Sequence, residues 1–226
     1  MRRFDIFELL PGIWCVQHRP SKSAAYIIKT FPGAVLIDTG PDPSAASVMM
    51  GLQNARVGLS SVRLLALTHW HFDQSAGAAA LHARAGTRVR YAKAEALFMT
   101  GQRETGFWKR QRHPKVSPIV ADGFVKDGEK LEGGLEAIAT PGHTDGHVAY
   151  YLETRALLFA GDAFTVTQKG ELEVNDEGRA SAARCLERPI EGLFPAHGRP
   201  VTERGAINAM RERLRKLSSG PSHRTS

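Results

Sequence analysis

Residues 63–78 constrain this chain more than any other stretch, because a short apolar run ends there in side chains that bind metals. The run Leu64–Leu67 is too brief for a helix and predicts a buried strand. His69, His71 and Asp73 follow at a spacing of i, i+2 and i+4, so on an extended segment they would share one face. Two imidazoles and a carboxylate that converge in this way suit a divalent metal, above all zinc.

Three further apolar runs also end in side chains that bind metals. Each run is short, as a strand is, and in each case the ligand type follows soon after the last apolar residue. Chance could place one ligand at a strand end, but four such ends in 226 residues indicate a common site. The additional ligands are His143 after residues 135–139, Asp162 after residues 156–160 and His197 after residues 192–195.

The rest of the chain alternates predicted strands and helices, separated by Pro, Gly, Ser and Lys. Antiparallel strands of a meander are expected at Ile13–Val16, Ala25–Ile28 and Ala34–Ile37, a strand at Thr87–Tyr91, and a hairpin at Val148–Leu152 and Ala156–Ala160. Helices are expected over Pro43–Arg56, Ser75–Ala85, Ala92–Met99 and a closing helix with an apolar stripe of Ile207, Met210, Leu214 and Leu217.

Two features of the pattern leave alternatives open. Asp38 ends the third strand of the meander, either as simple turn chemistry or as a buried acid that orients the metal loop. The segment 100–118 mixes aromatic residues such as Trp108 with cations such as Lys109. It is either a solvated, variable loop or a lid over an anionic substrate, with the mixed residues concentrated in 103–115.

Composition places the chain among soluble globular proteins. Hydrophobic residues make up 42% of the chain and charged residues 23%, and none of the apolar stretches is long enough to cross a bilayer. Asp5, Glu8 and Pro11 interrupt what would be the apolar core of a signal peptide, so a cytoplasmic protein is expected. We expect one domain over residues 1–217 and a disordered polar tail over 218–226.

The net charge of +7 suits an anionic substrate. Much of the charge lies in residues 103–115 and in the closing helix with its tail, and it is not accompanied by a recognised nucleic-acid module. We therefore expect a small-molecule substrate and neither a nucleic acid nor a membrane as partner. Cys15 and Cys185 cannot form a disulfide framework and are expected to be buried free thiols.

Taken together, these motifs resemble those of the metallo-β-lactamase superfamily. The resemblance spans about residues 10–217 and rests on Thr-His-Trp-His-Phe-Asp-Gln, Thr-Pro-Gly-His-Thr-Asp-Gly-His, Phe-Ala-Gly-Asp-Ala and Pro-Ala-His-Gly, with Ile-Asp-Thr-Gly as a weaker mark. It implies an α/β fold, a four-layer αββα sandwich of two mixed β-sheets flanked by helices.

The resemblance also implies two metal sites, and the second departs from the family pattern. The family has histidine where Gln74 stands, and an amide oxygen is a poorer ligand for zinc than an imidazole nitrogen. We therefore expect one tightly bound zinc and a second site that is weak, empty or occupied by zinc, manganese or iron. The implied ligands are His69, His71 and His143 at the first site, and Asp73, Gln74 and His197 at the second, with Asp162 bridging both.

An intact first site implies a metal-dependent hydrolase, similar to the compact members of the superfamily and to a glyoxalase II-like core. A zinc-bound hydroxide would attack a small ester, thioester or lactone. Asp73 and Asp162 are the expected catalytic carboxylates, and without a second metal one of them would act as general base, its pKa raised by its like-charged neighbour. His147 would be either a catalytic helper or a structural histidine.

Two other functions remain open from the sequence. A binding or regulatory protein could retain the fold without catalysis, with Gln74 marking a degenerate second site. A phosphodiesterase or nuclease-type member of the superfamily is the other alternative. Metal content together with metal-dependent turnover distinguishes the enzyme from a binding protein, because a decayed site would purify without zinc.

Overall fold

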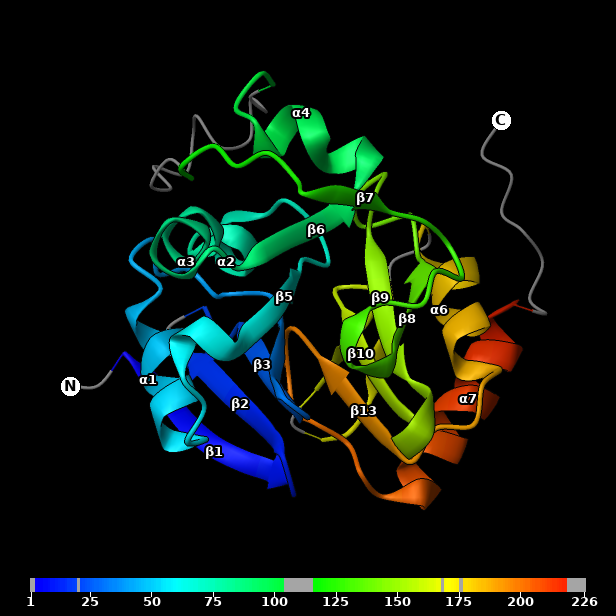
Figure 1. Cartoon of the computed structure of the whole chain (residues 1–226). Helices are drawn as coiled ribbons and strands as arrows, with labels where there is room; N and C mark the ends of the chain where they lie inside the picture. The colour runs from blue at the N-terminus through cyan, green and yellow to red at the C-terminus, as the bar shows by residue number, and fades with distance from the viewer. Residues whose placement is uncertain (1–2, 20, 104–115, 168, 175–176, 219–226) are drawn as a thin grey trace.

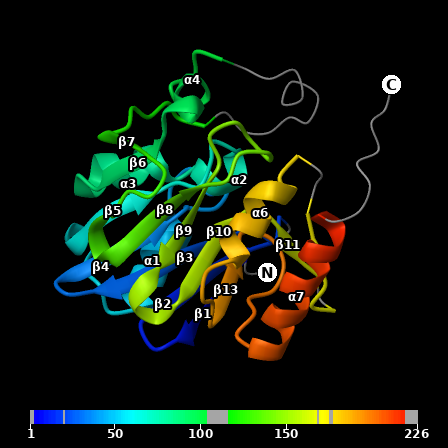
Figure 2. The same cartoon turned by 90° about the vertical axis from the view of Figure 1, so that its right-hand side faces the viewer.

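Two β-sheets face one another in the structure, and helices cover the outer face of each (Figure 1). The computed structural model describes residues 3–19, 21–103, 116–167, 169–174 and 177–218. Figure 2 shows the same layers from the side, with the helices of the first half of the chain and those of the second half on opposite outer faces. The predicted four-layer αββα sandwich is thereby confirmed.

The first sheet contains seven strands, which follow one another across the sheet in chain order. Neighbours from β1 to β4 pair antiparallel and neighbours from β4 to β7 pair parallel. Among the parallel strands, β4 and β5 are mostly apolar, because both of their faces are largely covered. The strands are β1 (Phe4–Leu10), β2 (Ile13–His18), β3 (Ala24–Thr30), β4 (Gly33–Ile37), β5 (Val62–Ala66), β6 (Arg88–Ala92) and β7 (Gly123–Val125).

The second sheet has four strands in the order β13-β10-β9-β8. The predicted hairpin is its centre, since β9 and β10 pair antiparallel, and β13 joins β10 in parallel. These strands are β8 (Leu135–Ala139), β9 (Val148–Leu152), β10 (Leu157–Gly161) and β13 (Gly192–Pro195). A separate two-stranded sheet pairs β11 (Thr165–Val166) with β12 (Leu172–Glu173).

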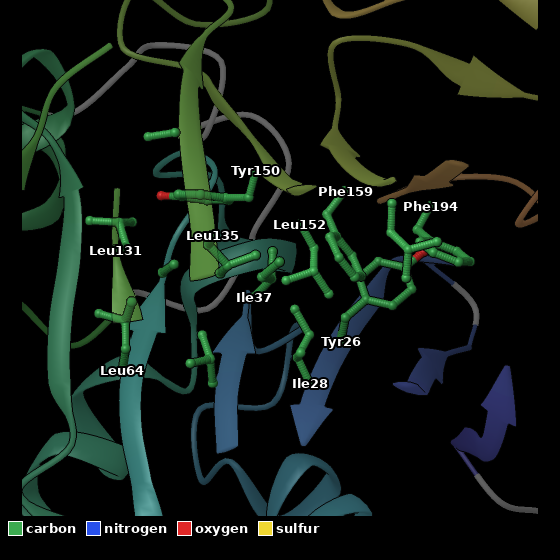
Figure 3. Packing of buried hydrophobic residues seen from close by; sticks show 14 of the residues in the cluster. Tyr26, Ile28, Ile37, Leu64, Leu131, Leu135, Tyr150, Leu152, Phe159 and Phe194 are labelled. Carbon is green, nitrogen blue, oxygen red and sulfur yellow. The ribbon is translucent and has the colours of Figure 1, made fainter. Parts of the chain in front are cut away.

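Aliphatic and aromatic side chains together fill the space between the two sheets (Figure 3). The ring centre of Phe159 lies 5.3 Å from that of Tyr26 and 5.1 Å from that of Phe194. The buried Tyr26 hydroxyl donates a hydrogen bond of 2.6 Å to the Pro195 carbonyl. These contacts join β3 of the first sheet to β10 and β13 of the second, so they fix the position of one sheet relative to the other.

Helices complete the two outer layers. Val48, Leu52 and Leu81 pack α1 and α3 on the first sheet, and the predicted stripe on α7 is buried against the second at Ile207 and Met210. Beside α7 lies α6 (Figure 2). The helices are α1 (Ala46–Asn54), α2 (Phe72–Ser75), α3 (Ala78–Ala85), α4 (Ala96–Met99), α6 (Arg179–Leu186) and α7 (Arg204–Ser218), with 3-10 turns η1 (Leu59–Ser61), η2 (Lys93–Glu95), η3 (Glu132–Gly134) and η4 (Glu153–Arg155).

Several predicted boundaries differ from the structure. The helix expected from Pro43 begins only after Ala45, whose φ of 56° lies in the left-handed region. The helix expected over Ser75–Ala85 is divided into α2 and α3, although it ends at Gly86 as predicted. The segment expected to be helical over Ala92–Met99 is a 3-10 turn followed by one helical turn. Strands β1 and β7 and helix α6 were not predicted at all.

Other expectations from the sequence have a plain outcome. Cys15 and Cys185 are free and buried, as predicted. Among the described residues, none of the helices combines the length and the apolar character that crossing a membrane requires. Of the polar tail expected over 218–226, Ser218 instead ends helix α7, and residues 219–226 lie outside the described residues.

Candidate metal centre

The predicted ligands lie at one end of the sandwich, just past the carboxyl ends of strands from both sheets. His69 and His71 follow β5 of the first sheet, whereas His143 follows β8 and Asp162 follows β10 of the second. One ligand atom from each of these four residues lies within 4.8 Å of the others. The structure therefore brings four of the predicted residues into one cluster, which we call the first group.

Imidazole nitrogens and a carboxylate oxygen face one another in the first group. The Nε2 atom of His143 lies 2.9 Å from Nδ1 of His71 and 3.2 Å from Oδ2 of Asp162. The Nε2 atom of His69 lies 3.6 Å from the same carboxylate oxygen. Tetrahedral ligands about 2.0–2.1 Å from a zinc ion are roughly 3.3 Å from each other. The observed separations lie close to that value, so these four atoms could bind a single ion.

A second group adjoins the first through Asp162. The Nε2 atom of His197 lies 3.0 Å from Oδ2 of Asp73 and 3.6 Å from Oδ2 of Asp162. The side-chain amide nitrogen of Gln74, which is fully buried, lies 3.2 Å from the same imidazole nitrogen. Asp162 therefore lies between the two groups, where the family resemblance implied a bridging ligand.

One geometric prediction about the motif is wrong. His69, His71 and Asp73 do not share one face of an extended strand, because β5 ends at Ala66 and the chain enters α2 directly after His71. Asp73 lies in the first turn of this helix, where side chains rotate by about 100° per residue rather than alternating between two faces. The turn directs Asp73 to His197 in the second group instead of to the first.

Asp38 is buried and orients the metal loop, which decides between its two interpretations. Its carboxylate accepts hydrogen bonds of 2.8 Å from both the backbone N–H and the hydroxyl of Thr68. The same hydroxyl lies 3.0 Å from Nδ1 of His69. With its proton donated to Asp38, the hydroxyl accepts from His69, which leaves Nε2 of His69 unprotonated toward the cluster. Burial raises the pKa of Asp38, and the two bonds from Thr68 oppose that rise.

His147 has a structural role in the same loop system. Its Nε2 atom accepts a hydrogen bond of 2.9 Å from the backbone N–H of Asp162, and its Nδ1 atom lies 2.7 Å from the Thr140 hydroxyl. Burial lowers the pKa of His147 to about 3, so the ring is neutral and can accept this bond. His147 thus supports the backbone of Asp162 from behind the cluster.

Two histidines of the first group are held in the form that binds metals. Burial, and then the neighbouring His143, lowers the pKa of His71 to about 4. Burial likewise holds the pKa of His69 well below its usual value. Both rings are therefore neutral near pH 7, with a lone pair available on one nitrogen.

The second group and the shared carboxylate have the opposite electrostatic character. Burial alone would lower the pKa of His197, but its hydrogen bond to Asp73 and the charge of Asp162 raise it to about 9. Burial alone would raise the pKa of Asp162, but the hydrogen bond from His143 and the nearby imidazoles lower it. A carboxylate whose pKa is raised by its like-charged neighbour, as expected from the sequence, is therefore not found at Asp162.

Several polar atoms of the two groups lack a hydrogen-bond partner, which tests whether the site fits a metal ion. Among the described residues, the buried and unpartnered atoms include Nε2 of His69, Oδ1 of Asp162 and Oε1 of Gln74. Each unsatisfied buried group costs about 1–3 kcal/mol. A divalent cation would satisfy these nitrogen and oxygen atoms together, so the donor set fits the metal that the sequence implies.

Two supporting residues escaped the sequence analysis. Thr68 directly precedes the histidine motif, and this adjacency was the only signal that it offered, because its partner Asp38 lies 30 residues away in the chain. Glu95 is a buried acid that contacts both metal loops. An acid in front of a short helix is common at helix N-termini. The sequence around Glu95 therefore did not indicate its contacts with Trp70 and Gly146, which lie 25 and 51 positions away in the chain.

The predicted lid falls largely outside the described residues, and so do Trp108 and Lys109. Arg103 is described, and its guanidinium lies over the ring of Phe98 at 5.2 Å. Phe98 in turn stacks on Trp70 with ring centres 4.4 Å apart. Because Trp70 contacts His71, this stack connects the start of the segment to the first group.

The fold and the two groups define a class of αββα proteins that carry a candidate metal centre where the strand ends of both sheets meet. Residues 18–221 match the metallo-beta-lactamase superfamily. Because the match covers most of the 226 residues, the chain belongs to this superfamily.

A curated relative and two solved structures show how far the similarity extends. The hydroxyacylglutathione hydrolase of Cereibacter sphaeroides is 31% identical over 153 residues, which are 68% of this chain and 51% of that enzyme. The chain spans about half the length of the curated relatives it matches. A Cronobacter sakazakii metallo-beta-lactamase with a HARLDQ motif is 21% identical, with a TM-score of 0.74 over 94% of this chain and 92% of that one. A protein solved in a di-iron-bound form is 26% identical, with a TM-score of 0.69 over 88% of this chain and 97% of that one.

Proposed function

We propose that the protein is a metal-dependent hydrolase that acts on a small ester, thioester or lactone. The observation that carries the proposal is the convergence of His69, His71, His143 and Asp162, whose ligand atoms lie within 4.8 Å of one another. Within this cluster, Nε2 of His69 and Oδ1 of Asp162 are buried without a hydrogen-bond partner among the described residues, and a bound metal ion would satisfy both atoms.

The first group would hold the metal more tightly than the second. His69, His71 and His143 offer three imidazole nitrogens, and because Asp162 is shared with the second group, a fourth position can stay open for water, as at catalytic rather than structural zinc. The second group offers Asp73 and His197, but the third ligand is Gln74, whose amide is a weaker donor. We propose one tightly held zinc per chain and a weaker second site for zinc, manganese or iron.

A metal ion bound here would lower the pKa of a water ligand toward neutrality and polarise the carbonyl group of the substrate. The side chains of the protein would orient the attacking water. Asp162 faces both groups, so it can accept a hydrogen bond from an attacking water on either side. Asp73 is the second catalytic carboxylate that we propose, and its contact with His197 holds it at the edge of the same space.

The substrate class draws on one relative and on charge. The Cereibacter enzyme is a hydrolase of a hydroxyacylglutathione, a thioester, and the likeness extends over 68% of this chain. The net charge of +7 favours substrates that carry an anionic group, because a positive surface raises their local concentration. We therefore propose an acyl substrate with a carboxylate or another anionic group.

The second candidate function is binding without catalysis, and Gln74 is the observation that favours it. Glutamine in place of histidine weakens the second site, because an amide is a poorer zinc ligand than an imidazole. Against this, Gln74 is fully buried and lies 3.2 Å from His197, so its amide is built into the second group. The Cronobacter lactamase motif HARLDQ and the present His-Trp-His-Phe-Asp-Gln both end in Asp-Gln, which supports catalysis with glutamine at this position.

Metal analysis of the purified protein, joined to a panel of esters, thioesters, lactones and phosphodiesters, tests the proposal. The metal-loaded protein should hydrolyse an acyl substrate, and His71→Ala should lose both metal and turnover. His82→Ala is the matched control, because His82 lies on α3 and contacts the Thr87 carbonyl instead of the cluster. A metal-loaded protein that hydrolyses none of these substrates would support the binding function, and turnover of phosphodiesters alone would support the nuclease-type alternative.

A further inference from the structure

Glu95 is a buried carboxylate between the two loops that carry the first group. It ends η2, directly after β6, and is 1% exposed. Its Oε2 atom accepts a hydrogen bond of 2.8 Å from the backbone N–H of Trp70. Its Oε1 atom accepts two more, of 2.9 Å from the Thr144 hydroxyl and of 2.7 Å from the backbone N–H of Gly146.

We infer that Glu95 is a positioning residue of the metal centre, which sets the separation between the histidines of the two loops. Trp70 lies between His69 and His71 in the chain, and Thr144 directly follows His143. One carboxylate therefore holds the backbone of the first loop at Trp70, and it holds the second loop through the Thr144 hydroxyl and the backbone N–H of Gly146. The inference rests on the proposed metal centre, although not on which substrate the enzyme hydrolyses.

The two loops come from different sheets, which is why they need a common anchor. The Trp70 loop follows β5 of the first sheet, and the Thr144 loop follows β8 of the second. Packing between the two sheets alone would fix the positions of the strand ends less precisely than the ligand geometry of a metal ion requires. The distance of 2.9 Å between Nδ1 of His71 and Nε2 of His143 depends on how these two loops are positioned. Glu95 bonds to both of them through one carboxylate, to Trp70 on the first loop and to Thr144 and Gly146 on the second.

The loop around residue 146 is shaped to fit this carboxylate. A Cβ atom added at Gly146 would lie 2.5 Å from Oε1 and 2.8 Å from Cγ of Glu95, which real Cβ atoms do not tolerate. Glycine thus permits the backbone N–H to approach the acid directly. The close approach is difficult to explain as ordinary helix capping, because Glu95 bonds to two distant loops and not to the first turn of α4.

Three donors aimed at one side chain require acceptors on both of its oxygens. A glutamate supplies them, because its ionised form only accepts hydrogen bonds. A glutamine has the same shape but presents an NH₂ group to one of the two loops, so a donor would face a donor. Glu95→Gln therefore breaks the hydrogen-bonded connection between the two loops with little change in side-chain volume. Metal-binding residues depend on such supporting contacts, and losing one typically costs about 10–100-fold in metal affinity.

The test compares Glu95→Gln with Glu136→Gln in the full-length protein. Glu136 is also a buried carboxylate, but it pairs with Lys130 and Arg188. Zinc affinity is measured by competition with a chelator, and the coordination geometry by the absorption bands of the cobalt-substituted protein. We expect Glu95→Gln to weaken zinc binding by about 10–100-fold and to shift the cobalt bands, while Glu136→Gln retains the wild-type values.

Unchanged zinc affinity and an unchanged cobalt spectrum in Glu95→Gln would overturn the inference. So would a loss of affinity that Glu136→Gln reproduces, because that result would assign the effect to general stability. If Glu95→Gln does not fold, Thr144→Val decides the question, since it removes one donor and should weaken zinc binding severalfold. A wild-type protein that binds zinc but hydrolyses nothing would reject the proposed function and leave this test intact, because both readouts report metal binding.

Discussion

The Asp38 carboxylate accepts two hydrogen bonds of 2.8 Å from Thr68, one from its backbone N–H and one from its hydroxyl. Thr68 in turn lies 3.0 Å from Nδ1 of His69. An acid at the end of β4 is thus connected through one residue to an imidazole at the end of the neighbouring parallel strand β5. The orientation of His69 depends on this connection, since the ring nitrogen that faces the cluster must be the unprotonated one.

Thr68→Val tests this connection with little change in volume. The substitution removes the hydroxyl that bonds to both Asp38 and His69, so the imidazole loses its fixed orientation and tautomer. We expect zinc affinity to fall by about 10–100-fold, measured by chelator competition. Thr87→Val is the control, because the buried Thr87 hydroxyl has no hydrogen-bond partner among the described residues. Equal zinc affinities in the two variants would contradict a role for Thr68.

The layers of the fold were predictable because they depend on short apolar runs between breakers. Both faces of β4, β5 and β9 are covered, so each is a nearly continuous apolar run that a reader of the sequence can recognise. Strand β1 was missed for the opposite reason. It lies at the edge of the first sheet, its side chains are half-buried or exposed, and Asp5 and Glu8 interrupt the apolar pattern.

The candidate ligands were predictable by residue type, but their partners were not. Histidines and carboxylates at four strand ends are informative together, because chance seldom places so many ligand types at such positions in one chain. Asp73 was expected on the wrong kind of segment, since the change from strand to helix at α2 depends on how the loop packs. Glu95 could not be foreseen, because its contacts are made to Trp70 and Gly146 across large separations in the chain. Long-range contacts of this kind leave no periodic signal in the sequence.

Gln74→His tests whether the ligand type limits the second site. In the wild-type protein we expect about one metal per chain after gentle dialysis, because the second group has an amide where an imidazole would bind more strongly. The histidine variant should retain about two. Elemental analysis measures both values. Two equally retained ions in the wild-type protein would show that glutamine suffices, and an unchanged ratio in Gln74→His would assign the limit to geometry.

Asp162→Ala removes the carboxylate that the two groups share. Its backbone N–H still bonds to His147, so the loop after β10 keeps its anchor. We expect turnover to fall by about 100-fold or more, the scale on which a positioned acid or base contributes. Steady-state kinetics at saturating zinc measure the change. Asp5→Ala serves as control, since Asp5 lies on β1 and pairs with Arg19. Near-normal turnover in Asp162→Ala would remove Asp162 from the catalytic residues.

Glu136→Gln tests a prediction about stability and pH away from the metal centre. Burial alone would raise the pKa of Glu136, but hydrogen bonds from Lys130 and Arg188 outweigh it and lower the pKa below the usual value of 4.5. The folded state therefore binds this proton more weakly than the unfolded state does. The ionised group stabilises the fold above about pH 4.5, and this contribution is lost as the pH falls through the lowered pKa.

At pH 7 Glu136→Gln should accordingly lower the thermal unfolding midpoint by roughly 2–4 °C, because both cations lose their charged acceptor. The difference between wild type and variant should shrink as the pH falls below 4.5, because the unfolded wild-type chain then takes up the proton, and it should be lost once the pH passes the lowered pKa of the folded state. Thermal unfolding from pH 3.5 to 7, followed by circular dichroism on the metal-free proteins, separates this effect from metal binding. A midpoint difference that stays constant across the range would mean that the pair stabilises the fold through packing rather than through charge.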